Sequence, residues 1–267
     1  MHHNKIYLLS FPLIFISIIS LSCTSKVAFQ SLDVPDGVHY QTLTGYLIKP
    51  EGAGPFPAIV MLHHCSGLDN EGFFQWARQL KKLGYVAFLV DSFGPRGITN
   101  VCKNGAPTIK FRASDAHAAK LYLSRLSFVD PENIAVMGWS HGAWGSILAI
   151  QDPEHKFPGK PFKAAVAYYP YCISLFDLNA PLLILIGEED DWTPAGLCQT
   201  RLPKNSPYDI TLKIYPETYH SFFFPLRSPF YYYGHWIEYN PNATRDAKER
   251  TIQFLDKYLK KYQKIIF

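Results

Sequence analysis

Hydrophobic and polar positions follow two alternating patterns along this chain. Seven short, mostly apolar runs rich in β-branched and aromatic residues predict buried strands. They are residues 45–49, 58–63, 86–91, 134–138, 164–169, 182–187 and 211–215. Between them, apolar residues recur at helical spacing, as in 73–83 and 112–126. This alternation predicts one α/β domain over residues 41–267, with a mostly parallel central sheet and helices on both faces.

The last helix has a recognisable start. Asn240 is a suitable N-cap, and Pro241 fits the first turn, where the missing backbone N–H costs nothing. Ile252, Leu255 and Leu259 recur at helical spacing and mark its expected buried face. The sequence therefore predicts a C-terminal helix that packs on the sheet.

The N-terminal segment has a different composition. Residues 8–21 form an almost wholly apolar run of about 14 residues, which is short for a membrane span. We predict that 1–22 are a secretory signal peptide, that 23–40 are a linker, and that the protein is exported to the periplasm, a membrane surface or the medium. Cys23 is a candidate for lipid attachment, as in a membrane-anchored lipoprotein; the alternative is that Cys23 is removed or incidental.

Composition narrows the function classes. Hydrophobic residues make up 48% of the chain and charged residues 18%, which indicates a globular protein and not a disordered one. The formal net charge is +4, with Lys and Arg spread along the chain, which gives no support for nucleic-acid binding. Four cysteines after residue 23 allow three disulfide pairings, among which we favour Cys102 with Cys198. The sequence contains no C-x-x-C spacing, so it gives little support for a zinc site.

Ser140 lies in the motif Gly138-Trp139-Ser140-His141-Gly142, a G-x-S-x-G. The motif follows an apolar strand-like run and leads into a helical pattern, as expected of a nucleophile elbow. A strained turn there would hold the serine hydroxyl clear of the sheet, and glycine on either side would remove Cβ atoms that would collide. Ser140 is therefore the candidate nucleophile.

A base and an acid follow Ser140 in the order expected for this kind of site. Four consecutive carboxylates, residues 188–191, come directly after the predicted strand 182–187. Either Asp190 or Asp191 could orient a base, and the others could solvate the turn or cap a helix near Pro194. His220 follows the last predicted strand and is the candidate base.

Backbone N–H groups are expected to stabilise an oxyanion beside Ser140. The N–H of His141 directly follows the nucleophile, and the N–H of Cys65 lies in the loop after the predicted strand 58–63. A metal site at His63, His64 and Cys65 is disfavoured, because neighbours in an extended chain point to opposite faces. No metal or cofactor is predicted.

Six groups of residues resemble the dienelactone hydrolase family of α/β-hydrolases, particularly its exported bacterial members. They are 62–68, 90–97, Arg112 with Asp115, 136–142, 187–194 and 219–222. The resemblance implies the α/β-hydrolase fold and ester or lactone hydrolysis. It favours Asp190 as the acid, because the family usually has Asp three residues after the strand-ending Gly.

Departures from the family pattern bear on the substrate. Dienelactone hydrolases proper have a Cys nucleophile held by a Glu in the oxyanion loop, whereas this chain has Ser140 and, at the position of the Glu, His64. Dienelactone itself is therefore not the expected substrate. Arg96 resembles an Arg that holds the substrate carboxylate in the lactone-cleaving members of the family, and the alternative is an ion pair on its loop.

Aromatic residues follow His220 and could form an apolar wall beside the base, or could simply pack their loop. With Arg96, we name Trp139 and Phe222 as candidate substrate contacts. The sequence as a whole predicts a serine hydrolase that cleaves small carboxylic esters or lactones through an acyl-enzyme. The alternatives are a peptidase or carbohydrate esterase with the same three residues, and a non-catalytic envelope lipoprotein.

Overall fold

The computed structural model describes residues 24–32, 41–68, 71–105, 108–151, 157–173 and 175–260. The predicted signal peptide, 1–22, and the lipid-attachment candidate Cys23 lie outside the described residues. Among those residues, no helix is both long enough and apolar enough to cross a membrane.

Eight strands form the central sheet, in the order β1-β2-β4-β3-β5-β6-β7-β8. Their bounds are β1 (Thr24–Gln30), β2 (Thr42–Ile48), β3 (Phe56–Leu62), β4 (Val86–Asp91), β5 (Val129–Trp139), β6 (Ala165–Tyr168), β7 (Leu182–Gly187) and β8 (Ile210–Tyr215). The β1–β2 and β2–β4 pairs are antiparallel, and the pairs from β4 to β8 are parallel. The carboxyl ends of the parallel strands therefore meet along one edge, where the candidate site lies.

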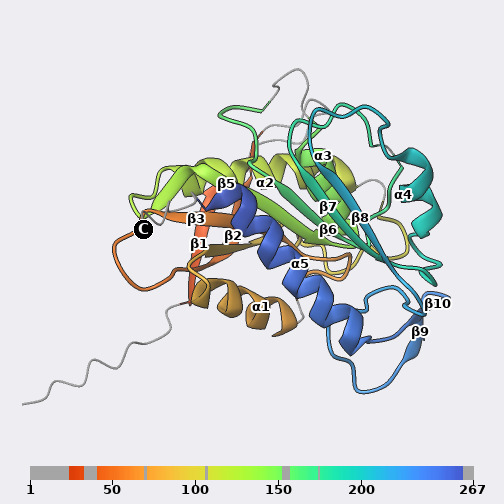
Figure 1. Ribbon diagram of the computed structural model, residues 1–267. Coiled ribbons are helices and arrows are strands. Elements are labelled where there is room, and N and C mark those ends of the chain that lie inside the picture. The colour runs from red at the N-terminus through yellow and green to blue at the C-terminus, as the bar shows by residue number, and fades with distance from the viewer. Residues whose placement is uncertain are drawn as a thin grey trace, which may run out of the picture.

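Helices cover both faces of this sheet. They are α1 (Glu71–Lys82), α2 (Ile109–Ser124), α3 (His141–Ala149), α4 (Ala195–Arg201) and α5 (Pro241–Leu259), with a short 3-10 turn η1 (Gly94–Arg96). In Figure 1, α5 crosses one face of the sheet with α1 beside it, and α2 and α3 cover the opposite face. This arrangement confirms the predicted α/β fold.

The seven predicted strands are all present, and β4 and β7 have the predicted bounds. The largest difference is β5, which begins at Val129, five positions before the predicted start at residue 134. Val129 pairs with Phe56, and the register then shifts before pairing resumes at Ile134. Pro131 lies in this irregular part of β5, where no hydrogen bond between strands requires its missing N–H.

Seven residues of the segment expected to be a linker form β1 instead. Residues 24–30 pair with β2 along their whole length. Alternate side chains of β1 face inward, and the innermost, Phe29, is buried with its ring 5.4 Å from that of Phe88. The apolar residues of this edge strand are few, so the strand depends on the sheet beside it.

The start of α5 agrees with the prediction. The Asn240 side chain accepts hydrogen bonds from the N–H groups of Asn242 and Ala243, at 3.1 and 3.0 Å. Leu255 and Leu259 are buried against the sheet. Asn240 is therefore the N-cap, and it satisfies donors that have no partner within the helix.

A second small sheet, formed by β9 (Phe230–Tyr232) and β10 (His235–Ile237), is an antiparallel hairpin that the sequence patterns did not predict. Strands of three residues are too short for a periodic pattern to be read. A parallel bridge between His220 and Ile237 joins the hairpin to the loop after β8. The hairpin therefore lies beside the candidate base.

Two disulfides are present, and neither is the favoured pair. Cys65 bonds to Cys102, and Cys172 bonds to Cys198, with Cα–Cα distances of 4.8 and 5.0 Å. The prediction of Cys102 with Cys198 is wrong, because pairing depends on which loops meet in space. The Val101 N–H donates to the Cys65 carbonyl at 2.9 Å, which aligns the two loops that the first disulfide joins.

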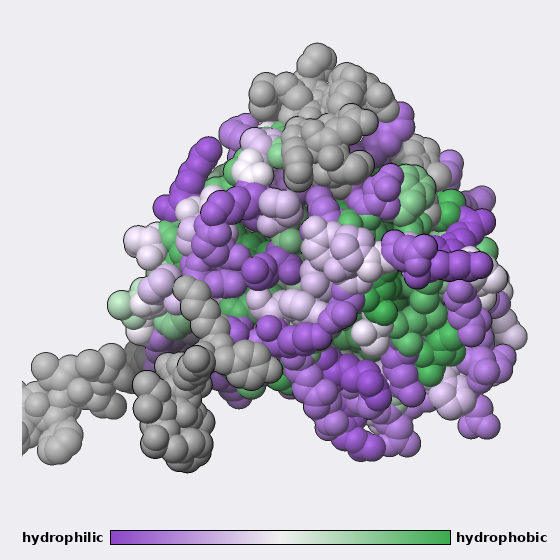
Figure 2. Space-filling view, turned by 45° about the horizontal axis from the view of Figure 1, so that its top comes forward, coloured by the Kyte–Doolittle hydropathy of each residue, from purple (hydrophilic) through white to green (hydrophobic). Residues whose placement is uncertain are grey.

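The core lies between the sheet and its helices and is built mainly from apolar side chains, with a smaller set of buried polar and charged residues among them. Figure 2 shows mainly hydrophilic side chains over one face of the molecule, with a hydrophobic area at one side. Burial of the apolar faces of sheet and helices is the main stabilising contribution to this fold.

Candidate active site

Ser140 occupies a strained turn between β5 and α3. Its backbone angles are φ 52° and ψ −116°, a conformation that is costly for a residue with a side chain. A Cβ atom on Gly138 would lie 2.2 Å from the Gly142 carbonyl oxygen, and one on Gly142 would lie 2.2 Å from the Leu62 carbonyl oxygen. The turn therefore requires both glycines, as the motif predicted.

Three side chains that are distant in sequence meet at this turn. The His220 Nε2 atom lies 3.0 Å from Ser140 Oγ, and His220 Nδ1 lies 2.8 Å from Asp190 Oδ2. All three residues are buried. Asp191 points elsewhere, with its carboxylate more than half exposed and 3.2 Å from His235 Nδ1. Of the two candidate acids, the structure brings Asp190 to His220.

The loop after β7 holds the Asp190 carboxylate in one orientation. Asp190 Oδ1 accepts hydrogen bonds from the N–H groups of Trp192 and Thr193, at 3.0 and 2.7 Å. The Thr193 hydroxyl donates to Asp190 Oδ2 at 2.9 Å. With these donors in place, Asp190 accepts the Nδ1–H of His220, and the Nε2 lone pair then faces Ser140. No local sequence pattern identifies Thr193 as a supporting residue.

A buried network supports the loop after β3. Arg112 donates from Nη2 to the His63 carbonyl oxygen at 2.6 Å and from Nη1 to His63 Nε2 at 3.0 Å. The other ring nitrogen, Nδ1, lies 2.7 Å from the His64 carbonyl oxygen and donates to it. Burial and the nearby Arg112 charge lower the pKa of His63 well below its usual value. His63 is therefore neutral, and its hydrogen bonds hold the loop after β3 in place.

The predicted oxyanion residues, Cys65 and His141, both line the cavity beside Ser140. Cys65 follows β3, and its disulfide to Cys102 joins this loop to the loop before α2. His141 is the first residue of α3, and its ring nitrogen Nε2 lies 3.0 Å from the Gly105 carbonyl oxygen. Burial, and then the charge of Arg112, lower the pKa of His141 to about 3, so the ring is neutral and donates to Gly105. Both residues border the space in front of Ser140.

Arg96 does not border that space. Its guanidinium donates two hydrogen bonds to the Asp115 carboxylate, at 2.7 and 2.8 Å, and a third to the Ser92 carbonyl oxygen. It also lies over the Phe111 ring, 4.0 Å from the centroid. Both Nη atoms of Arg96 are engaged by these partners and Arg96 lines neither cavity at Ser140, so the structure does not place Arg96 where it was predicted to contact substrate. The alternative, an ion pair, is what the structure shows.

Trp139 and Phe222 are also not at the surface of the site. Both side chains are fully buried. The Trp139 ring stacks on Tyr168 with centroids 5.3 Å apart, and Phe222 packs against Tyr169 and Tyr215. The prediction that these residues contact substrate is wrong, because their large apolar rings are used in the core.

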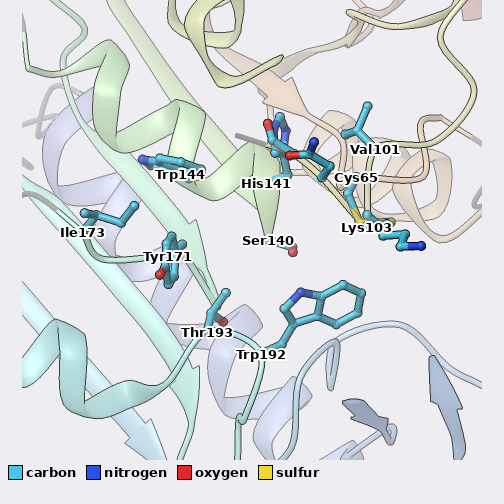
Figure 3. A pocket seen from close by; sticks show the side chains of 13 residues that line it. Cys65, Val101, Lys103, Ser140, His141, Trp144, Tyr171, Ile173, Trp192 and Thr193 are labelled. Atoms are coloured by element: carbon cyan, nitrogen blue, oxygen red, sulfur yellow. A yellow bond between two sulfur atoms is a disulfide. The ribbon is translucent and has the colours of Figure 1, made fainter. Parts of the chain in front are cut away.

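Two cavities meet at Ser140. The first cavity, of about 360 Å³, is drawn in Figure 3. Its lining residues are Cys65, Val101, Cys102, Lys103, Asn104, Gly105, Ser140, His141, Trp144, Tyr171, Ile173, Trp192 and Thr193. The second cavity, of about 400 Å³, is lined by His64, Cys65, Ser66, Glu71, Ser140, Trp192, His220, Ser221, Leu226, Phe230, Tyr232 and Ile237. Trp192, next to Asp190 on the loop after β7, borders both cavities, and no sequence pattern indicates this position.

His64, which stands at the position of the Glu in dienelactone hydrolases proper, lines the second cavity. Its Nδ1 accepts the Ser66 N–H at 3.2 Å. Burial, His220 and Arg112 lower the pKa of His64 to about 4, so the imidazole is neutral near pH 7. Within the described residues, no group of three or more His, Cys, Asp and Glu is placed to hold a metal ion.

The sheet order and the strained turn at Ser140 define the class of the α/β hydrolases. Within that class, the model of the dienelactone hydrolase family matches residues 43–259. The chain therefore belongs to the dienelactone hydrolase family, as the sequence motifs indicated.

Three known proteins illustrate this relationship. A Synechocystis protein named "Putative carboxymethylenebutenolidase" is 24% identical over 238 residues, which are 82% of this chain and 93% of that protein. An uncharacterized protein of Mycobacterium tuberculosis is 28% identical over 187 residues, and the match spans 63% of each chain. The crystal structure of a "Putative Dienelactone Hydrolase" from Klebsiella pneumoniae has a TM-score of 0.65 at 19% identity, over 88% of this chain and all of that one. At that identity, the structural likeness shows the fold.

Proposed function

We propose that this protein is a serine hydrolase that cleaves small carboxylic esters or lactones through an acyl-enzyme. The observation that carries the proposal is the hydrogen-bonded chain from Ser140 Oγ through His220 to Asp190, with contacts of 3.0 and 2.8 Å. A nucleophile, a base and an orienting acid in hydrogen-bond contact are the arrangement that acyl transfer requires.

The proposed reaction has two halves. In the first, His220 Nε2 takes the proton of Ser140 as Oγ bonds to the ester carbonyl carbon, and the carbonyl oxygen becomes an oxyanion that accepts from the N–H groups of Cys65 and His141. The bond to the leaving oxygen then breaks, and His220 returns the proton to that oxygen. In the second half, water repeats these steps and releases the acid and free Ser140.

Export and membrane attachment form a second part of the proposal. It rests on the apolar N-terminal segment and on Cys23, and the two disulfides are consistent with an oxidising compartment. Mass spectrometry of the protein purified from its host tests both steps. A mature chain that begins at a diacylated Cys23 would support lipidation, and an intact N-terminus would contradict export processing.

A fluorophosphonate probe and a substrate pair test the hydrolytic proposal. Wild-type protein should be labelled on Ser140 and should hydrolyse p-nitrophenyl acetate, and Ser140→Ala should lose both properties. Turnover of aminoacyl-nitroanilides in preference to the ester would favour a peptidase. If the folded wild-type protein resists the probe and cleaves neither substrate, the proposal is wrong and the non-catalytic alternative is favoured.

A further inference from the structure

The two cavities at Ser140 differ in the catalytic group that each contains. His220 borders only the second cavity, whereas His141 borders only the first. Ser140 and Cys65 border both. The proposed nucleophile and one proposed oxyanion donor therefore lie at the boundary, and the proposed base lies on one side of it.

This asymmetry assigns the two halves of an ester. In the proposed reaction, His220 gives its proton to the leaving oxygen, so the leaving group must lie on the His220 side. The oxyanion, the leaving oxygen and the acyl substituent surround the same carbon, so the acyl substituent extends away from His220. We infer, resting on the proposed function, that the first cavity binds the acyl group, that the second binds the leaving group, and that the acyl group is aromatic.

The aromatic side chains that line the first cavity are the evidence that the acyl group is aromatic. Trp144 and Tyr171 meet edge to face there, with ring centroids 5.6 Å apart and an interplanar angle of 78°. In Figure 3, these two rings and Ile173 lie together on one side of Ser140, and Trp192 lies on another. A flat ring between them gains edge and face contacts that an aliphatic group of similar size cannot make.

Exposure of these side chains supports a binding role. Tyr171 is 37% exposed and Ile173 is 39% exposed, although both are large and apolar. Covering these side chains with a ligand removes apolar area from water. Trp144 is half-buried on α3, one turn after Ser140, so the same helix fixes the nucleophile and this wall.

Esters with one leaving group and different acyl groups test the inference. The purified protein is assayed with p-nitrophenyl acetate, cyclohexanecarboxylate and benzoate, and each kcat/KM is divided by the rate of alkaline hydrolysis of that ester. The benzoate value should exceed the cyclohexanecarboxylate value by about tenfold. Tyr171→Leu and Trp144→Leu keep apolar bulk and remove a ring, and each should lower this ratio several-fold.

Phe230→Leu is the matched control, because Phe230 borders only the second cavity and is 42% exposed. It should change the selectivity between phenyl and ethyl acetate and leave the benzoate to cyclohexanecarboxylate ratio unchanged. Tyr171 lies at the surface, so its variant remains informative if Trp144→Leu does not fold.

The outcomes separate this inference from the proposed function. The inference alone is overturned if the protein hydrolyses acetate and is labelled on Ser140, but neither Tyr171→Leu nor Trp144→Leu changes the benzoate to cyclohexanecarboxylate ratio. A ratio that falls in Phe230→Leu instead shows that the cavities are assigned the wrong way round. Absence of both hydrolysis and labelling overturns the proposed function, and the inference with it.

Discussion

Replacing Arg96 by Leu should lower the free energy of unfolding by about 3 to 5 kcal/mol, because it leaves a buried carboxylate without its partner. Two hydrogen bonds of 2.7 and 2.8 Å join the guanidinium to both Asp115 oxygens, and the two side chains are 8% and 0% exposed. Burial raises the pKa of Asp115, and the hydrogen bonds and charge of Arg96, followed by Ser92 and the charge of Arg112, act against that rise. Without Arg96, the carboxyl must be buried as an ion or bind a proton.

A loss of this size in the free energy of unfolding is large enough to measure as a lower Tm. For a domain of this size, such a loss lowers the Tm by roughly 6 to 20 °C. Urea unfolding at pH 7, followed by tryptophan fluorescence, measures the same change. Lys160→Leu is the matched control, since its ion pair with Glu132 is 2.6 Å long but more than half exposed. Breaking that pair should cost less than about 1 kcal/mol.

The double variant Arg96→Leu/Asp115→Leu completes the test. It should be more stable than Arg96→Leu alone, because the Asp115 carboxylate is no longer buried without Arg96. The ratio of kcat/KM values for esters with and without a free carboxylate should stay at the wild-type value in all folded variants. An unchanged urea midpoint in Arg96→Leu, together with a KM raised only for carboxylate-bearing esters, would refute the structural role and restore a substrate-binding one.

Three further predictions follow from the site. In the folded protein, the pKa values of His64 and His141 are about 4 and about 3, below the usual 6.5, so the unfolded chain binds more protons at pH 5. The free energy of unfolding should therefore be full above pH 6.5 and fall by up to about 1.4 kcal/mol per pH unit for each ring as the pH drops towards 4. Equal urea midpoints at pH 7.5 and pH 5 would contradict this. Asp190→Asn should lower kcat by about 10⁴-fold with little change in the KM for p-nitrophenyl acetate, because it disturbs the tautomer of the base; a loss below tenfold would rule Asp190 out. Cys102→Ser releases the Cys65 loop from its disulfide and should lower kcat for the same ester with a smaller effect on KM. An unchanged kcat in the folded variant would show that the disulfide does not position the oxyanion donor.

The strand and helix pattern was determined by the sequence to a large degree, because the buried parallel strands are continuous apolar runs bounded by turn residues. The elbow at Ser140 was equally predictable, since a strained turn leaves room for no side chain at Gly138 or Gly142. In contrast, β1 has few apolar residues and becomes a strand only by pairing with β2. Edge strands of this kind depend on a partner that local sequence does not specify.

The roles of individual polar and aromatic side chains were decided by tertiary structure. Arg96 could bind an anion or an internal carboxylate, and only the position of Asp115 on α2 settles which. In the same way, disulfide pairing depends on which loops are adjacent, and that adjacency is set by the order of the strands in the sheet. Local sequence encodes backbone preference and side-chain chemistry, but partners distant in the chain are fixed only when the whole core packs.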